Sequence, residues 1–150
     1  MTVVYSKGFE QTLEKTDGTV PNGDDNLFTI SGAPILVTHF YGIVSTVIGA
    51  NACTCTIQYA CTDPAADIPL STAVSIVSDA VGTTYYISDA ALGVFTPITA
   101  GSVIQATQML PWLLTPGTLQ ATFSAANTGA IRWFIVYKML SQFSKVEAAA

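Results

Sequence analysis

Lysine and arginine are absent from Thr16 to Ile131, which is most of the chain. The basic residues lie on either side of this stretch: Lys7, Lys15, Arg132, Lys138 and Lys145. Globular domains carry about a quarter charged residues, whereas this chain carries 10%. Because surfaces of mixed charge keep single copies of a protein apart, a surface of Thr, Ser, Asn, Gln and apolar atoms suits packing against other protein. The composition therefore predicts a subunit of an assembly.

The lack of basic clusters also excludes two classes of partner. Binding to nucleic acid requires grouped lysines and arginines that displace counterions from the phosphates, and this chain has a net charge of −5. Anionic membrane surfaces attract the same basic groups. We therefore expect neither nucleic acid nor a membrane as a partner.

Long apolar runs are missing too, although the hydrophobic content is 50%. Gly, Pro, Ser, Thr or Asp interrupts each run before the ~18 residues of a helix that crosses a bilayer. The first residues, MTVVYSKGFEQ, contain no apolar signal-peptide core. At 150 residues the chain is expected to form one domain that is made in the cytoplasm.

The first 26 residues differ from the rest. They hold nearly half of the charged residues and end in a turn-rich run from Asp17 to Asn26. Phe9 and Leu13, four residues apart, predict one apolar contact on a short helix. We expect an extended N-terminal arm and hinge at residues 1–26, a body at 27–140, and a tail at 141–150 that is a helical turn or coil.

From residue 27 the pattern becomes that of β-structure. Branched and aromatic residues dominate, and turn residues recur about every 8–12 positions. The predicted strands are Leu27–Ser31, Pro34–Ser45, Cys53–Cys61, Ala73–Ser78, Thr83–Ser88, Val94–Ile98, Ser102–Met109, Thr118–Ala125 and Ala130–Leu140. The pattern predicts an all-β fold: a single antiparallel β-sandwich, jelly-roll-like, with the N-terminal arm attached.

Alternation along these strands predicts which side chains point inward. The inward sets are Cys53, Cys55, Ile57, Tyr59 and Cys61, then Leu119, Ala121 and Phe123, and finally Ile131, Trp133, Ile135, Tyr137 and Met139. The last two strands are predicted to pair as a hairpin through Ala126–Gly129. Phe134 and Val136 lie opposite the inward set, so both faces of the final strand are expected to be covered, inside the sandwich or by another subunit.

Catalytic and metal-binding patterns are weak. Cys53, Cys55 and Cys61 with His39 supply zinc-type ligands, but the cysteine spacing on a strand does not match a knuckle, and buried thiols are the preferred interpretation. His39 is the only histidine and stands in a predicted strand without a nucleophile elbow. We expect no cofactor, no metal site and no enzymatic activity.

Three other groups of residues were weighed as ligand sites. Asp17, Asp24 and Asp25 do not follow the calcium-loop spacing. Asp63 and Asp67 are too isolated to indicate a glycosidase. The aromatic residues Trp112, Trp133, Tyr85 and Tyr86 suit a sugar-stacking platform, although core or interface packing is the commoner use of such rings.

Several strings in the body carry a resemblance. They are LFTISGAPILVT at 27–38, YGIV at 41–44, TGAIRW at 128–133 and YKML at 137–140. With these strings the chain resembles small virion proteins of tailed bacteriophages. The resemblance implies a capsid decoration, or cement, protein: a β-rich and often trimeric subunit on the outer surface of the head, whose partner is the major capsid protein.

The expected function is therefore structural: decoration and stabilisation of a tailed-phage capsid by a homotrimer, without catalysis. The alternative is a tail-fibre, spike or other module that binds a receptor or glycan, and a small hydrolase built on His39 is a third hypothesis. The residues expected at the interface lie in the arm, the last strand and the tail: Lys7, Phe9, Leu13, Lys15, Arg132, Lys138 and Lys145.

Overall fold

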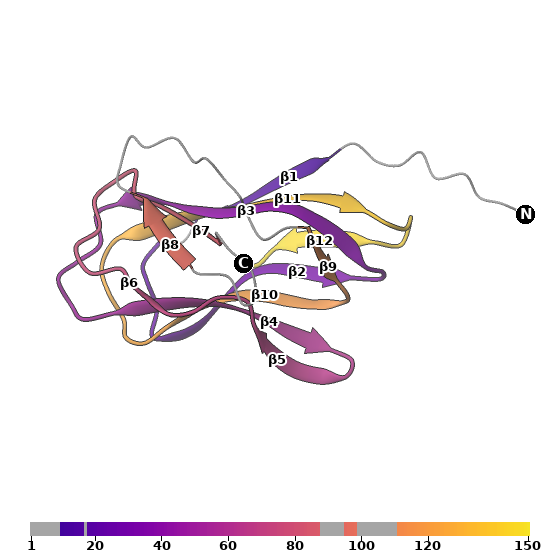
Figure 1. Ribbon diagram of the computed structural model, residues 1–150, viewed down its shortest axis with the longest axis horizontal. Helices are drawn as coiled ribbons and strands as arrows, with labels where there is room; N and C mark the ends of the chain where they lie inside the picture. The colour runs from indigo at the N-terminus through magenta and orange to yellow at the C-terminus, as the bar shows by residue number, and fades with distance from the viewer. Residues whose placement is uncertain (1–9, 17, 88–94, 99–110) are drawn as a thin grey trace, which may run out of the picture.

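The computed structural model describes residues 10–16, 18–87, 95–98 and 111–150. Two antiparallel six-stranded sheets pack face to face (Figure 1). The first sheet has the order β1-β11-β3-β7-β8, with β9 also pairing with β3, and the second has the order β12-β2-β10-β4-β5, with β6 also pairing with β4. The predicted all-β sandwich is confirmed.

The strands are numbered in the order in which they occur along the chain. Their bounds are β1 Gln11–Thr16, β2 Gly23–Ser31, β3 Ile35–Thr46, β4 Thr54–Thr62, β5 Ala65–Pro69, β6 Val74–Ser75, β7 Thr84–Ile87, β8 Phe95–Ile98, β9 Trp112–Leu114, β10 Gly117–Phe123, β11 Ala130–Met139 and β12 Lys145–Ala148. No helix long and apolar enough to cross a membrane occurs among the described residues.

The core between the sheets is formed by the alternating inward residues. Those of β4, β10 and β11 are buried as the period-two pattern predicts, with Cys61 and Met139 only partly so. Trp133 lies at the centre and is fully buried. Its ring stacks on Phe40, with centroids 5.6 Å apart and planes 7° apart, and also contacts Tyr85 at 6.4 Å.

The predicted hairpin between the last two long strands is wrong. β10 pairs with β2 and β4 in the second sheet, whereas β11 pairs with β1 and β3 in the first. The connection therefore crosses the core from one sheet to the other. The side chain of Asn127 fixes it: its amide donates to the carbonyls of Gly49 and Asn51, and its oxygen accepts from the Thr128 N–H.

The predicted arm and tail both contain strands of the sandwich. Within the arm, Gln11–Thr16 is strand β1 rather than a short helix, and β2 begins at Gly23 rather than at residue 27. Within the tail, Lys145–Ala148 is strand β12, paired with β2. β1 and β12 are edge strands of their sheets, and they carry charges as edges exposed to water often do, which made them look like extensions of the body.

Two further strands were not predicted. β5 forms a hairpin with β4 (Figure 1), and β9 pairs with the start of β3 where a boundary was expected. β6 covers only part of the predicted strand at 73–78. The predicted strand Ser102–Met109, together with Ser88 and Val94 at the ends of two others, lies outside the described residues.

Candidate functional site

The outside of the first sheet carries an apolar patch, the apolar face, whose members lie beside the exposed residues His39, Arg132 and Lys138. The pairing register places Phe134 of β11 beside Tyr41 of β3, and Tyr41 beside Tyr86 of β7. The Tyr41 and Phe134 rings stack, with centroids 4.9 Å apart and planes 15° apart. The apolar face consists of the half-buried residues Leu36, Tyr41, Ile43, Tyr86, Phe134 and Val136. Such a run of partly exposed aromatic and aliphatic side chains is typical of protein contact surfaces.

Arg132 lies on the apolar face and makes two contacts there. Its guanidinium carbon is 5.5 Å from the centroid of the Phe134 ring, a cation–π distance. Its Nε–H donates to Glu14 Oε1 of β1 at 2.7 Å. This hydrogen bond lowers the pKa of Glu14 and raises the pKa of Arg132, and it is the main cause of both shifts. The charge of Arg132 is thus balanced within the face.

Replacing Arg132 by glutamine is expected to raise the pKa of Glu14 back toward its ordinary value. Because the folded-state pKa of Glu14 lies below its unfolded value, the stability contributed by the pair is present above the unfolded pKa and is lost as the pH falls through the folded pKa. The pair is exposed, so its contribution to stability is small. An NMR titration of Glu14 checks this. Lys145→Gln should leave that titration unchanged, and an identical midpoint in Arg132→Gln would contradict the assignment.

The outer face of the second sheet is polar. Gln58 donates to Gln120 at 2.9 Å, and Gln120 donates to Asn26 at 2.7 Å, so a hydrogen-bonded ladder crosses β4, β10 and β2. Beside it the Thr122 hydroxyl donates to Asp24 at 2.7 Å. The side chains of this ladder satisfy one another, which suits a face that meets water. The two outer faces of the sandwich therefore differ sharply in chemistry.

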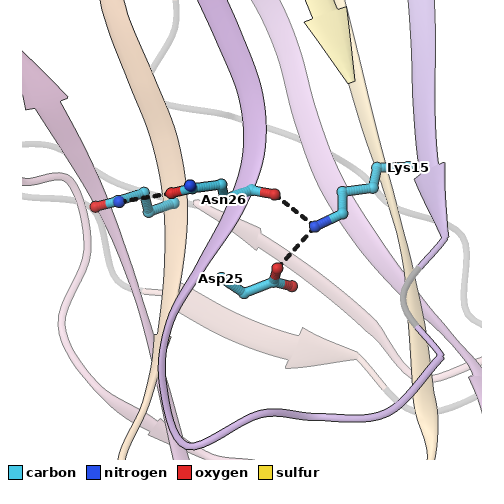
Figure 2. Close-up of polar contacts among 4 residues, drawn as sticks. Lys15, Asp25 and Asn26 are labelled. Carbon is cyan, nitrogen blue, oxygen red and sulfur yellow. Dashed lines mark hydrogen bonds and ion pairs between the residues drawn. The ribbon is translucent and has the colours of Figure 1, made fainter. Parts of the chain in front are cut away.

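Lys15 was predicted at an interface, and the structure places it inside the fold. Its side chain points from β1 between the two sheets, and its ammonium donates to Asp25 Oδ1 of β2 at 2.7 Å and to the Asn26 carbonyl (Figure 2). The two side chains retain only 9% and 15% exposure. The pair therefore links the two sheets through their interior.

The other predicted interface residues are distributed as follows. Leu13 is half-buried and packs against the core. Arg132 and Lys138 lie on the outside of β11, where Lys138 is 3.8 Å from Glu10, and Lys145 of β12 is 2.6 Å from Glu147. Lys7 and Phe9 lie outside the described residues. The structure thus brings Arg132 and Lys138 onto one strand and separates Lys15 and Lys145 from them.

The residues weighed as zinc ligands lie on opposite sides of the first sheet. Cys53 and Cys55 of the β4 region are buried in the core, and the Cys53 thiol donates to the Ala125 carbonyl at 3.0 Å. His39 is exposed on the outside of β3. Within the described residues, no three His, Cys, Asp or Glu side chains are grouped to hold a metal ion.

The two tryptophans belong to the core, with Trp133 fully buried and Trp112 9% exposed. Neither ring lies on an outer face of the sandwich, and Trp112 lines a pocket instead. Tyr85 is buried as well: burial, followed by the hydrogen bond that its hydroxyl donates to Asp79, raises its pKa. Of the aromatic residues proposed as a platform, Tyr86 alone lies on an outer face.

An apolar pocket of about 340 Å³ opens at the end of the sandwich near the β4–β5 hairpin and β9. It is lined by Tyr59, Cys61, Ile68, Leu70 and the segment 111–115. The Tyr59 hydroxyl donates to the Thr115 carbonyl across its floor. Sequence reasoning missed this pocket, because its two sides come from strands β5 and β9, which were not predicted.

Comparison of the chain with protein-family models, with curated proteins and with solved structures finds no match.

Proposed function

We propose that this chain is a structural virion protein that decorates and stabilises the capsid of a tailed bacteriophage. Its partners are the major capsid protein and further copies of itself, arranged as a homotrimer on the outer surface of the head. It is made in the host cytoplasm and carries out no catalysis. The proposal combines the sequence resemblance with the surface chemistry of the sandwich.

The observation that carries the proposal is the contrast between the two outer faces. The first sheet presents the apolar face, and the second presents a polar hydrogen-bonded ladder. A domain that acts by contact needs one face that gains free energy when it is covered and one that is stable in water. We infer that the apolar face meets the shell and that the polar face points to solvent.

A decoration protein needs only a modest interface for each copy. A standard specific interface buries about 1,600 Å² in total, and many copies on one lattice reinforce one another when each also contacts its neighbours. The described cations pair with carboxylates of the same chain. Contact through the apolar face therefore depends on burying apolar area rather than on strong charge attraction.

Rebinding to phage heads tests the proposal. Purified protein is mixed with heads that lack it, and bound protein is measured after sedimentation. Phe134→Asp is expected to weaken binding by at least about 30-fold, the effect of losing a contact of about 2 kcal/mol at the centre of an interface. Thr118→Asp, on the central strand of the polar face, is the matched control and should bind as the wild type does. Failure of the wild type to bind heads would exclude the decoration role.

The same variants address the alternative of a receptor- or glycan-binding module. The stacked Tyr41 and Phe134 rings are the aromatic platform that this alternative requires, because both tryptophans are buried. Specific retention of the wild type on a glycan array, lost in Phe134→Asp, together with no binding to heads, would favour it over decoration.

A further inference from the structure

The most exposed large apolar side chains of the described residues gather mainly at one end of the sandwich. Leu113 of β9, Ile68 of β5, and Leu140 and Phe143 of the turn after β11 lie at this end. Figure 1 shows the β11–β12 turn and the β4–β5 hairpin projecting there together. This end therefore carries a second apolar surface, which borders the apolar face of the first sheet where Leu113 pairs with Leu36.

Leu140 and Phe143 form an apolar knob on a fixed turn. The Ser144 hydroxyl donates to the Pro34 carbonyl at 2.7 Å, and the Phe143 N–H donates to the Ser141 hydroxyl oxygen at 3.2 Å. The Phe143 carbonyl lies so close over Gly32 that a Cβ there would overlap it. The backbone is thus held from several sides while Phe143 is 68% exposed. Because the backbone of the knob is already ordered, binding through it costs little further backbone entropy.

The pocket near the β4–β5 hairpin forms an apolar socket. Its walls are preformed, because Tyr59 is tied to the Thr115 carbonyl and Trp112 packs against Phe40 with ring centroids 6.0 Å apart. A volume of about 340 Å³ is sufficient for a phenylalanine ring and part of a leucine. Ile68 and Leu113, on its rim, are 44% and 62% exposed. The socket therefore offers an apolar surface that gains free energy when it is covered.

The charges around the knob and the socket are complementary. Asp63 lies in the turn of the β4–β5 hairpin, two residues from Cys61 of the socket, and no described lysine or arginine pairs with it. Lys138 and Lys145 flank the knob, and their present partners, Glu10 and Glu147, are exposed. Exposed pairs of this kind contribute little to stability, so these lysines can pair with new carboxylates at low cost.

The knob is not seated in the socket of its own chain, because Leu140 and Phe143 are exposed and neither lines the pocket. In the first sheet Met139, which precedes the knob, pairs with Ile35, and Ile35 pairs with Leu114 of the socket. At ~4.8 Å for each of these two steps, the strands that lead to the knob and to the socket lie roughly 10 Å apart. Since the turn that carries Phe143 is fixed by its hydrogen bonds, the knob stays outside the socket of its own chain and is available to another copy. A contact between two different patches is heterologous and forms a ring when the rotation closes.

We propose that the knob of one copy, Leu140 and Phe143, inserts into the socket of the next copy and so joins copies of this chain into a closed ring. Lys138 or Lys145 then approaches Asp63 of the neighbouring copy. The contact deepens the self-association part of the proposed function and rests on it. It leaves the aromatic part of the apolar face, Tyr41, Tyr86 and Phe134, free for the shell.

Disulfide trapping tests this contact directly, because Cys61 lines the socket and the other two cysteines are buried. Phe143→Cys should form covalent multimers on mild oxidation, since a disulfide needs the two Cβ atoms to approach to about 3.8 Å. Peptide mapping should identify a bond between Cys61 and position 143. The multimers should be absent from Phe143→Cys/Cys61→Ser and from Val81→Cys, which places a thiol at an exposed apolar position elsewhere. The proposal would be overturned if Phe143→Cys formed no covalent multimers, or if Phe143→Cys/Cys61→Ser formed as many as Phe143→Cys does.

Sedimentation velocity gives a second measurement on chains without new cysteines. Phe143→Glu is expected to weaken self-association at least about 10-fold, whereas Val81→Glu should not change it. Unchanged association of Phe143→Glu would overturn the ring contact. Trapping that succeeds while the wild type does not bind heads would uphold the contact and remove the decoration role. If trapping fails while the wild type binds heads normally, the ring contact is excluded and the decoration role stands.

Discussion

Replacing Lys15 by methionine should lower the free energy of unfolding by about 3–5 kcal/mol, the cost of leaving a buried charge without its partner. Lys15 Nζ is 2.7 Å from Asp25 Oδ1, and both side chains are largely buried. The second carboxylate oxygen, Asp25 Oδ2, is buried and has no hydrogen-bond partner among the described residues. Asp25 therefore depends on the ammonium for its compensation. Equilibrium unfolding in urea measures the effect.

Two control variants separate this buried pair from ordinary surface pairs. Lys15→Met combined with Asp25→Leu removes both charges and should recover most of the lost stability, because apolar replacements of a buried pair are often neutral. Lys145→Ala breaks an exposed pair and should cost at most about 1 kcal/mol. A loss below about 1 kcal/mol in Lys15→Met would mean that the ammonium does not compensate Asp25.

Replacing Trp133 by alanine should cost about 3–5 kcal/mol, since the largest fully buried side chain leaves a cavity that β-strands cannot close. Gly42 is its partner in the β3–β11 register, and a Cβ at Gly42 would lie 2.6 Å from Trp133 Cζ3. Gly42→Ala alone should therefore destabilise the protein by about 1–3 kcal/mol through overpacking. Thermal and urea unfolding of both single variants give these values.

The double variant decides whether the two positions share one packing constraint. In Gly42→Ala/Trp133→Ala the added methyl enters space that the indole has left, so the combined loss should be smaller than the sum of the single losses by about 0.5–3 kcal/mol. Strictly additive losses would show that the strain at Gly42 does not arise from the indole ring.

The period of two in β4, β10 and β11 predicted which of their side chains are buried, because each strand has one face in the core. It could not predict which strands pair. Asn127 and Gly129 indicate a chain reversal, but a reversal within one sheet and a crossing to the other sheet use the same turn residues. The choice depends on the buried faces of distant strands, such as β2 and β3, which local sequence does not encode.

The candidate surfaces were predicted only in part. Phe134 and Val136 stood out because the final strand is apolar on both sides, and both lie on the apolar face. Tyr41 joined them only through the β3–β11 register, which a single sequence does not show. Lys15 was misleading, because one charge in a polar segment looks solvated unless its buried partner, Asp25, is also known.

The crossing between β10 and β11 has a consequence for how the chain reaches its native state. β11 lies between β1 and β3 in its sheet, so β1, Gln11–Thr16, can pair only after residues 130–139 have been synthesised. β2 likewise awaits both β10 and β12. Pairing between segments so far apart in sequence slows folding. Strands β1 and β2 therefore emerge from the ribosome with open edges, and the two sheets are completed only after β10, β11 and β12 have followed.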